Sequence, residues 1–325
     1  MKIGVIVAVY NGERFLLEQL ESIANQSRKP DAIWIRDDGS TDQSKPLVQQ
    51  FITDHPELCI HFIQGQNVGF KENFRLLLSE AYNKMDWIFL SDQDDRWDSD
   101  RILKMEKQIQ KVDNMSAIAS SFRFMNQKSE IYSIPLKQGW SNQNLIPRVI
   151  SEFRLEPISV DELTFHNYFQ GCAMAVHQSV AEEYLKINNP YLPHDWMLSL
   201  IAASKNELYF WNEPLFDYRI HADNTIGLPQ SSRFEFFNRI KNMNTLYNRT
   251  IVIKQSKEVL ETLEINYPEL MTENRKQQLQ FTKENLKLIE YKKIIPLIGQ
   301  FSNPFYHQYK SKFGQIMDLI YCITH

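Results

Sequence analysis

Three carboxylates directly follow a short apolar run in the first third of the chain. Residues 88–90 (Ile-Phe-Leu) have the pattern of a strand covered on both faces, and Asp92, Asp94 and Asp95 come next. Side chains two positions apart on an extended chain share a face, so we expect Asp92 and Asp94 to approach one Mg²⁺ or Mn²⁺ ion. Taken alone, the cluster could also be a solvated acidic turn that caps the next helix.

A second acidic pair, Asp37 and Asp38, follows another strand-like run and precedes Gly39. These carboxylates could accept hydrogen bonds from a nucleobase or a ribose hydroxyl, while Gly39 allows a tight turn. An ordinary cap and turn is the alternative. The chain has no GxGxxG after its first strand-like run and no GxxxxGK[ST], so neither a dinucleotide-binding fold nor a P-loop is supported.

The elements that must position these residues alternate between strand and helix over the first hundred residues, which is typical of a parallel α/β sheet. The predicted strands are 3–9, 32–36, 60–63 and a fourth that ends at the acidic cluster. The predicted helices are 13–25, one running through Val48 and Phe51, and one that contains Phe74, Leu77, Leu78 and Ala81. Right-handed crossovers bring the carboxyl ends of such strands to one edge, so the polar loops should form one nucleotide-sized site.

Composition excludes several classes of protein. The chain has 325 residues, 43% of them hydrophobic, enough for a substantial core, and its three cysteines contain no CxxC pair, which argues against a disulfide framework and a structural zinc site. Residues 231–325 carry 14 Lys and Arg against 9 Asp and Glu, so with a total of −4 the first 230 residues are acidic at −9. This balance argues against nucleic acid as the main partner. No run approaches the roughly 18 apolar residues of a membrane span, and the apolar N-terminal run is expected to be a strand rather than a signal segment.

The order of the motifs VAVYNG, RDDGSTD, NVGFKENF, FLSDQDDRW, QGCAMAV, HDW and YRIHADN resembles that of the family 2 inverting glycosyltransferases, nearest the bacterial rhamnosyltransferase-like branch. The resemblance covers residues 1–230. It implies an α/β GT-A fold, which is a Rossmann-like, mostly parallel sheet flanked by helices, with a nucleotide-binding half (1–100) and an acceptor-binding half (101–230). It also implies transfer of a sugar from a dTDP- or UDP-linked donor to a glycan or a lipid-linked oligosaccharide in cell-surface polysaccharide synthesis, with Mn²⁺ or Mg²⁺ as cofactor.

The resemblance also implies roles for single residues. The metal ligands would be Asp94 and His221, and the base that deprotonates the acceptor would be Asp195. Asp195 could otherwise be only a helix N-cap, and a helix N-terminus should lower its pKa and weaken it as a base. The nucleotide pocket would be lined by Ala8, Tyr10, Asn11, Asp38 and Asp92, and the donor and acceptor pocket by Gly171, Trp97, Trp196 and Arg219. Gly171 would allow a close approach of ligand in a flanking strand, Arg219 could face a phosphate, and the two tryptophans could instead be core residues.

Residues 231–325 have the texture of a helical C-terminal region, with predicted helices at 234–246, 251–263 and 273–295. Apolar residues recur three to four positions apart beside basic residues in a last stretch: Phe305, Tyr309, Phe313, Ile316 and Ile320. This stretch could lie on a membrane or pack on the catalytic domain or on a second copy in a homodimer. A cytoplasmic enzyme, peripheral on the inner face of the cell membrane, is the expected setting.

Two other functions are compatible with the acidic loops. A nucleotidyltransferase that makes nucleotide sugars would share the fold, but its glycine-rich basic loop is absent after the first strand, where the chain reads Asn11-Gly12-Glu13-Arg14. A non-catalytic carbohydrate-binding or membrane-attachment protein would not need the carboxylates Asp38, Asp92, Asp94 and Asp195. The glycosyltransferase is therefore the leading hypothesis.

Overall fold

The computed structural model describes residues 1–133, 148–187, 192–221 and 245–325. Their contacts divide the chain into two compact units. The sheet unit comprises the described residues of Met1–Ser159 and Asn167–Leu228, and the helical unit those of Val160–His166 and Pro229–His325. The predicted boundary at residue 230 and most of the predicted helix 234–246 lie outside the described residues, so both stay predictions.

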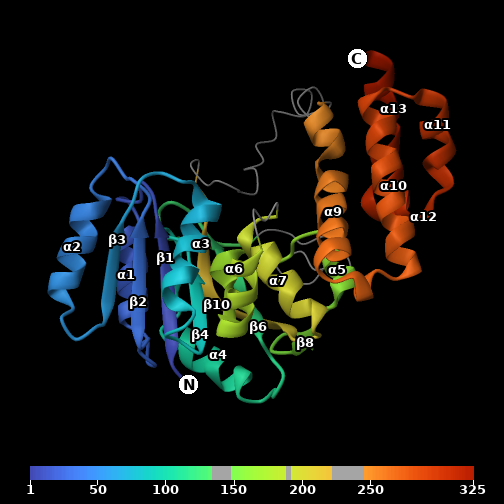
Figure 1. Ribbon diagram of the computed structural model, residues 1–325. Coiled ribbons are helices and arrows are strands. Elements are labelled where there is room, and N and C mark those ends of the chain that lie inside the picture. Colours follow the sequence, from blue (N-terminus) through green and yellow to red (C-terminus); the bar gives the residue numbers. More distant parts are fainter. Residues whose placement is uncertain (134–147, 188–191, 222–244) are drawn as a thin grey trace. The chain divides into compact units, whose positions relative to one another are not determined.

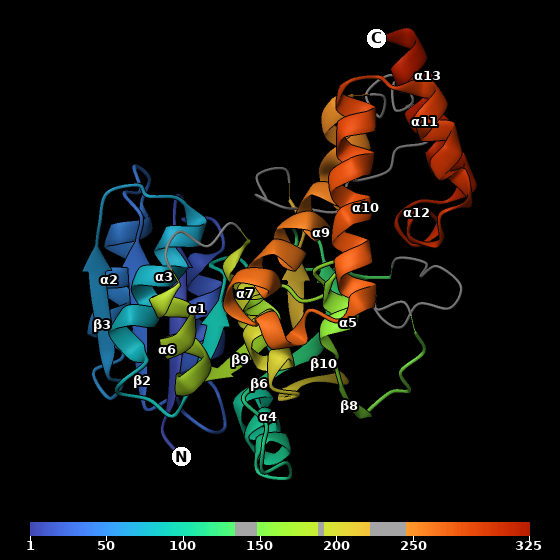
Figure 2. The same ribbon diagram turned by 45° about the vertical axis from the view of Figure 1, so that its right-hand side comes forward.

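The sheet unit is built on one mixed sheet of ten described strands, shown in Figures 1 and 2, in which the main order is β3-β2-β1-β4-β9-β6-β10-β5. Strands β1 to β4 are parallel, β9 is antiparallel to both neighbours, and β10 is parallel to β6. Most of the sheet therefore runs in one direction, as predicted. The strands are β1 (Ile3–Val9), β2 (Ala32–Asp37), β3 (Ile60–Gln64), β4 (Trp87–Ser91), β5 (Arg96–Trp97), β6 (Ala117–Met125), β7 (Ile131–Tyr132), β8 (Leu155–Pro157), β9 (Met174–His177) and β10 (Leu208–Arg219).

Helices cover the sheet as the right-handed crossover rule requires. Helices α1 and α2 lead from β1 to β2 and from β2 to β3, and their apolar residues share one core with α4 and one face of the sheet. Helix α3 leads back to β4 and packs with α6 and α7 (Figure 2). The helices of the sheet unit are α1 (Leu16–Ala24), α2 (Ser44–Asp54), α3 (Phe70–Ala81), α4 (Arg101–Ile109), α6 (Gln178–Lys186) and α7 (His194–Ser204), with a 3-10 turn η1 (Gly171–Ala173) before β9.

The helical unit is an α-helical hairpin of α9 and α10 with shorter helices packed on it. Its elements are α5 (Val160–Leu163), α9 (Leu246–Asn266), η2 (Pro268–Leu270), α10 (Glu273–Glu290), α11 (Ile294–Gly299), η3 (Gln300–Ser302), α12 (Pro304–Tyr309) and α13 (Lys312–Thr324). No helix in the described ranges is both long and apolar enough to cross a membrane.

The last apolar stretch was expected to form one amphipathic face, but it is divided between two helices. Lys310 has an extended backbone, and Ser311 caps α13 by accepting a hydrogen bond from the Gly314 amide at 3.2 Å. Phe305 and Tyr309 on α12 lie in the core of the helical unit, whereas Phe313 on α13 is 63% exposed. The break between α12 and α13 therefore gives the two halves of the stretch different surroundings.

Candidate active site

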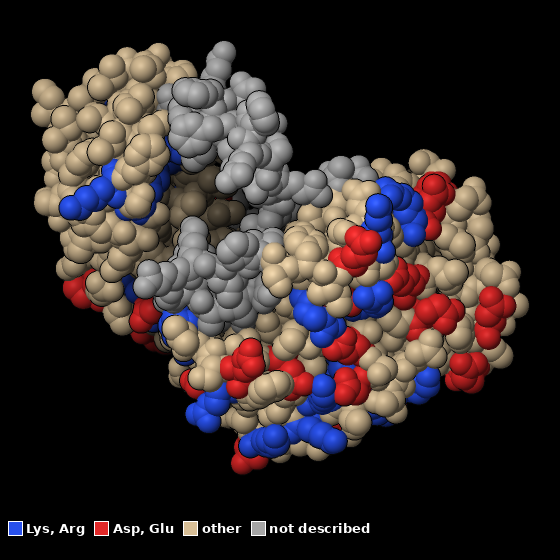
Figure 3. Space-filling view, turned by 180° about the vertical axis from the view of Figure 1, so that it is seen from behind, with Lys and Arg blue, Asp and Glu red and all other residues tan. Residues whose placement is uncertain are grey.

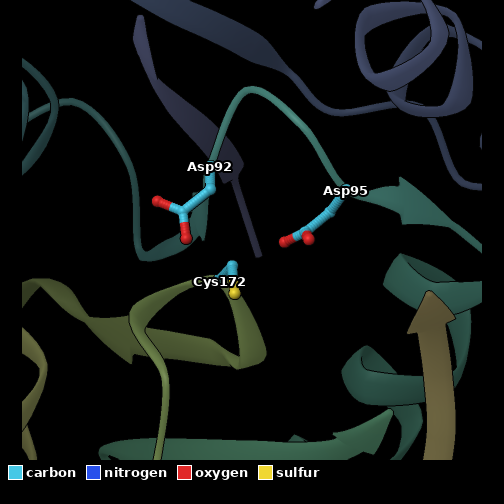
Figure 4. A group of neighbouring side chains, drawn as sticks. All are labelled: Asp92, Asp95 and Cys172. Carbon is cyan, nitrogen blue, oxygen red and sulfur yellow. The ribbon is translucent and has the colours of Figure 1, made fainter. Parts of the chain in front are cut away.

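In the acidic loop after β4, side chains no longer alternate between two faces as they do in the strand. The carboxylates of Asp92 and Asp95 converge, and with the Cys172 thiol on η1 their ligand atoms lie within 4.8 Å of one another (Figure 4). The Asp94 carboxylate instead meets His221, with Oδ2 2.7 Å from Nε2. The expectation that Asp92 and Asp94 share one face is thus corrected, because the chain turns after Ser91 and is no longer extended.

Burial and mutual repulsion change the acidity of this cluster. Burial, followed by the charge of Asp94, raises the pKa of Asp92 to about 7. The same causes, with Asp92 contributing as well, raise the pKa of Asp95 well above its usual range. One Asp95 oxygen, Oδ2, is buried without a hydrogen-bond partner. Concentrated negative charge and the unsatisfied Asp95 Oδ2 suit a hard divalent cation, so the residues present fit Mn²⁺ or Mg²⁺.

Two groups of side chains at this loop could hold such an ion, one completed by His221 after β10 and the other by Cys172 on η1. The side chains of Asp94 and His221 are 16% and 9% exposed, so they can be reached from solvent. Asp95 and Cys172 are completely buried, and Asp92 is half-buried. Because an ion that also binds a diphosphate must be reachable, the geometry favours the Asp94–His221 pair.

Arg219 at the end of β10 holds this loop in place. Its Nε donates to the Asp94 carbonyl oxygen at 2.7 Å, and its backbone amide donates to Asp95 Oδ1 at 3.1 Å. Its Nη2 forms a 2.6 Å ion pair with Glu18 on α1, and the side chain is completely buried. The expected contact of Arg219 with a phosphate is therefore corrected, because the guanidinium is enclosed by protein groups.

Asp195 lies in the first turn of α7, where Pro193 and not Asp195 is the cap. Its carboxylate accepts hydrogen bonds from the amides of Trp196 and Gly171 and from the Asn167 side chain. Burial outweighs these bonds and raises the pKa of Asp195 to about 6. The expected lowering of its pKa by the helix N-terminus is thus wrong. The Gly171 amide that bonds Asp195 is next to Cys172, whose thiol lies within 4.8 Å of the Asp92 and Asp95 carboxylates, so η1 connects Asp195 to the acidic loop.

Gly171 approaches another side chain closely. A Cβ atom built on it would lie 2.6 Å from Nε2 of His194. The His194 ring stacks on Phe74 at 4.1 Å, and burial lowers its pKa to about 3. The QGCAMAV run is a strand only from Met174, because the Ala173 amide donates to the Gln170 carbonyl oxygen and closes a turn. Gly171 therefore lies in a turn that helps to position Asp195. The expectation that it belongs to a strand flanking a ligand pocket is corrected.

The two tryptophans predicted to wall the pocket are core residues. Trp97 is 4% exposed and packs with Phe89 in the core of the sheet unit. Trp196 is 1% exposed on α7, whose residues 196–203 are all buried. The expectation for both is corrected, because neither offers an open aromatic face to a sugar.

On the nucleotide side, the predicted residues meet around the ends of β1 and β2. Tyr10 is 47% exposed, and Ala8 is the least buried residue of β1. Asn11, in the left-handed region at φ 48°, accepts a hydrogen bond from the Thr41 amide at 2.9 Å. The carboxylate of Asp38 is 2% exposed and accepts hydrogen bonds from Arg36, Val68 and Gly69. Asp38 therefore anchors the loop before α3, and its reading of a base stays a prediction.

Sequence reasoning did not single out Gln93, Glu18 or Asn167. The Gln93 side chain accepts from the Tyr10 amide at 2.7 Å and donates to the Tyr10 carbonyl oxygen at 2.9 Å, which ties the acidic loop to the end of β1. A neutral Gln side chain between two aspartates was a local signal for such a contact. Glu18 and Asn167 have no local signal, since their partners Arg219 and Asp195 are far away in the sequence.

Comparison with known proteins places this geometry in a family. The dTDP-rhamnosyl transferase RfbG of Shigella flexneri is 28% identical over 234 residues, which are 68% of this chain and 73% of the relative. An uncharacterized glycosyltransferase of Haemophilus influenzae is 25% identical over 75% of this chain and 73% of its own length. Both relatives are named as glycosyl- or rhamnosyltransferases, the class of enzyme that the motif order resembles.

Solved structures share the fold at low identity. TarS residues 1–349 of S. aureus with UDP-GlcNAc gives a TM-score of 0.55 at 13% identity, covering 99% of this chain and 89% of that one. The mannosyltransferase PcManGT of Pyrobaculum calidifontis with GDP-Man and Mn²⁺ gives 0.50 at 13%, covering 99% and 87%. The predicted GT-A fold with helices at its C-terminal end is thus confirmed. The model of the family described as "Glycosyl transferase family 2" matches residues 4–183, more than half of the chain, so the chain belongs to glycosyl transferase family 2, as the motifs predicted.

Proposed function

We propose that the chain is an inverting, metal-assisted glycosyltransferase that moves a sugar from a nucleoside-diphosphate donor to an acceptor hydroxyl. The observation that carries this proposal is that η1 joins Asp195 to the acidic loop, because the Gly171 amide bonds the Asp195 carboxylate while the Cys172 thiol lies within 4.8 Å of the Asp92 carboxylate. A base and a site for a metal-bound diphosphate must lie on opposite sides of the sugar for inversion. The proposed base, Asp195, is on α7, and the carboxylates of the proposed metal site are on the loop after β4.

Asp94 and His221 would hold the Mn²⁺ or Mg²⁺ ion. When bound, the ion neutralises the charge that develops on the leaving diphosphate. Arg219 and Glu18 keep Asp94 and Asp95 in position, while Gln93 joins this loop to Tyr10 beside the nucleotide. Tyr10 is exposed and can contact the base or the ribose.

Asp195 takes the proton of the acceptor hydroxyl as that oxygen attacks the anomeric carbon. The new carbon–oxygen bond forms on the face opposite the diphosphate, and the bond to the diphosphate oxygen breaks, so the configuration inverts. A carboxylate with a pKa of about 6 is charged at neutral pH and is a stronger base than an ordinary carboxylate. The buried surroundings that raise its pKa thus suit it to this step.

The donor is proposed to be dTDP-rhamnose or a UDP-sugar. The support is the similarity to a dTDP-rhamnosyl transferase and, at the level of fold, to an enzyme solved with UDP-GlcNAc. The acceptor is proposed to be a glycan or a lipid-linked oligosaccharide of a cell-surface polysaccharide, met by the enzyme on the cytoplasmic side of the membrane.

A thermal-shift panel of dTDP, UDP, GDP and CDP, each with and without Mn²⁺, tests the donor site on the wild type and on Asp94→Ala. A ligand that binds the native state raises the unfolding midpoint by mass action. We expect dTDP or UDP to raise it only with Mn²⁺, and Asp94→Ala to abolish that rise. If no nucleotide shifts the wild type, the chain lacks a donor site, and a non-catalytic role replaces the proposal.

A further inference from the structure

Helix α13 is apolar on two sides, but the helical unit buries only one of them. Met317 and Tyr321 point into the unit and are 8% and 7% exposed. On the outside are Phe313, Ile316, Ile320 and Ile323, which are 63%, 46%, 38% and 62% exposed. Their spacing of three, four and three residues places them in one row along the helix. Large apolar side chains in a row on a surface mark an interaction site more often than scattered ones do.

Helix α11 extends this apolar surface. It packs against α13, and it carries Ile295 and Ile298, which are 83% and 48% exposed. Tyr291, just before it, is 71% exposed, and Lys292 donates a hydrogen bond to the carbonyl oxygen of His325. The start of α11 therefore lies beside the end of α13. We call the exposed apolar residues of these two helices, together with Tyr291, the α11–α13 face.

The exposed charges around the α11–α13 face are mainly positive. Lys292, Lys293 and Lys312 are exposed. Of the nearby acidic residues, Glu290 just before Tyr291 is exposed and pairs with Lys254 on α9 at 3.2 Å. Asp318 is completely buried, with an ion pair to Lys310 at 2.5 Å. Figure 3 shows one side of the helical unit, at the upper left, as a largely uncharged surface interrupted by Lys and Arg.

We propose that the α11–α13 face docks on the surface of an anionic lipid bilayer. Exposed aliphatic and aromatic side chains beside lysines are the combination that partitions into the headgroup region of anionic membranes. A second copy of the chain fits less well, because a two-fold interface through this face would bring lysines toward lysines, and the exposed carboxylate beside it, Glu290, is already paired with Lys254. The inference deepens the proposed function by placing the enzyme where a lipid-linked acceptor would be, but it does not depend on the transfer reaction.

Co-sedimentation with vesicles tests the proposal on the full chain. The vesicles are phosphatidylcholine alone and equal parts of phosphatidylcholine and phosphatidylglycerol. We expect binding to the anionic vesicles, and we expect the double variant Phe313→Ser/Ile320→Ser to weaken it by about tenfold or more. Ile265→Ser is the matched control, because Ile265 is 77% exposed on α9 outside this face, and it should bind as the wild type does.

The charge contribution has its own variants. Lys293→Gln/Lys312→Gln should lower the partition onto anionic vesicles by about fivefold per lysine, while Lys276→Gln, an exposed lysine on α10, should leave it unchanged.

Vesicle binding that the Phe313→Ser/Ile320→Ser variant retains in full would overturn the proposal. So would a wild type that ignores anionic vesicles and forms a dimer, in analytical ultracentrifugation, that this variant loses. Because the variants lie outside the sheet unit, their nucleotide-dependent thermal shifts should stay intact, which separates failure of this proposal from failure of the proposed function.

Discussion

Both units bury some charged groups and expose some apolar ones, such as Asp318 in the helical unit and Phe153 in the sheet unit, but they concentrate these features differently. The sheet unit buries charged groups, among them Asp95, Arg101 and Arg219, which are all 0% exposed. The helical unit leaves large apolar groups in solvent, such as Phe313 and Ile295. Buried charges and exposed apolar rows both oppose stability, so each is a sign of function rather than of folding. Under the two proposals, this cost maintains a reactive site in the sheet unit and a membrane-docking surface in the helical unit.

The largest expected effect is the loss of the base. Asp195→Asn should lower the rate of transfer by about 10²–10⁴-fold, because a neutral amide cannot accept the acceptor's proton. The wild-type rate should rise with pH through about 6, where Asp195 loses its proton. The measurement is kcat against pH with an acceptor substrate. Asp113→Asn, an exposed carboxylate before β6, is the control and should keep the full rate.

The second effect separates the two groups of possible metal ligands. Asp94→Asn should lower the Mn²⁺-dependent rate by about 10²–10³-fold and weaken Mn²⁺ binding in a calorimetric titration with dTDP or UDP. Asp95→Asn should bind Mn²⁺ as the wild type does, because Asp95 is completely buried. If Asp95→Asn loses the metal and Asp94→Asn keeps it, the ion belongs to the group formed by Asp92, Asp95 and Cys172.

Third, the buried cation at the end of β10 can be removed. Arg219→Ala should reduce the free energy of unfolding by about 3 kcal/mol, because the partly buried carbonyl oxygens of Asp94 and Asn126 lose a charged donor. Glu18 loses one of two cations and keeps its ion pair with Arg96. Urea denaturation checks this, with Arg154→Ala as the control, since the Arg154 side chain is 70% exposed. Equal stability changes in the two variants would mean that burial of Arg219 has no structural role.

A smaller effect is expected from the charge of Asp195 itself. Its folded-state pKa of about 6 lies above the ordinary value of 3.8, so the native state binds this proton more tightly than the unfolded chain does. The charged carboxylate therefore lowers stability above that pKa, and the loss is recovered as the pH falls toward the ordinary value. Asp195→Asn should raise the free energy of unfolding by about 1–3 kcal/mol at about pH 8 and change it little at about pH 4. A variant less stable than the wild type at the higher pH would contradict the burial argument.

The smallest expected effect is that of Phe313→Ser on the surface of the helical unit, and the same substitution in the core of that unit serves as its comparison. Phe313→Ser should change the free energy of unfolding by less than about 0.5 kcal/mol, because Phe313 is 63% exposed. Phe305→Ser should cost about 3–5 kcal/mol, because Phe305 is 8% exposed in the core of the unit. Thermal unfolding of the two variants compares them directly. Similar losses would show that the α11–α13 face is part of the core.

Local sequence pattern determined most of the sheet unit. The run Ile3–Val9 is β1 with the predicted bounds, and the three further strands and their helices occur where apolar spacing placed them. The helix expected from Glu13 begins at Leu16, because the chain first makes a turn in which Gly12 accepts from the amides of Phe15 and Leu16. Such patterns are readable because the periods of strands and helices depend on neighbours within a few residues. The motif order was likewise sufficient to predict the family, which the family model then confirmed.

Tertiary structure decided which side chains meet in the site. Asp94 faces His221, 127 positions along the chain, and Arg219 donates to Asp94 rather than to a ligand. Burial, and not the local helix end, sets the pKa of Asp195. In the helical unit, packing on α9 and α10 decided that Phe305 is core and Phe313 is surface. Spacing cannot predict these outcomes, because loop direction, burial and charge depend on groups that only the folded chain brings together.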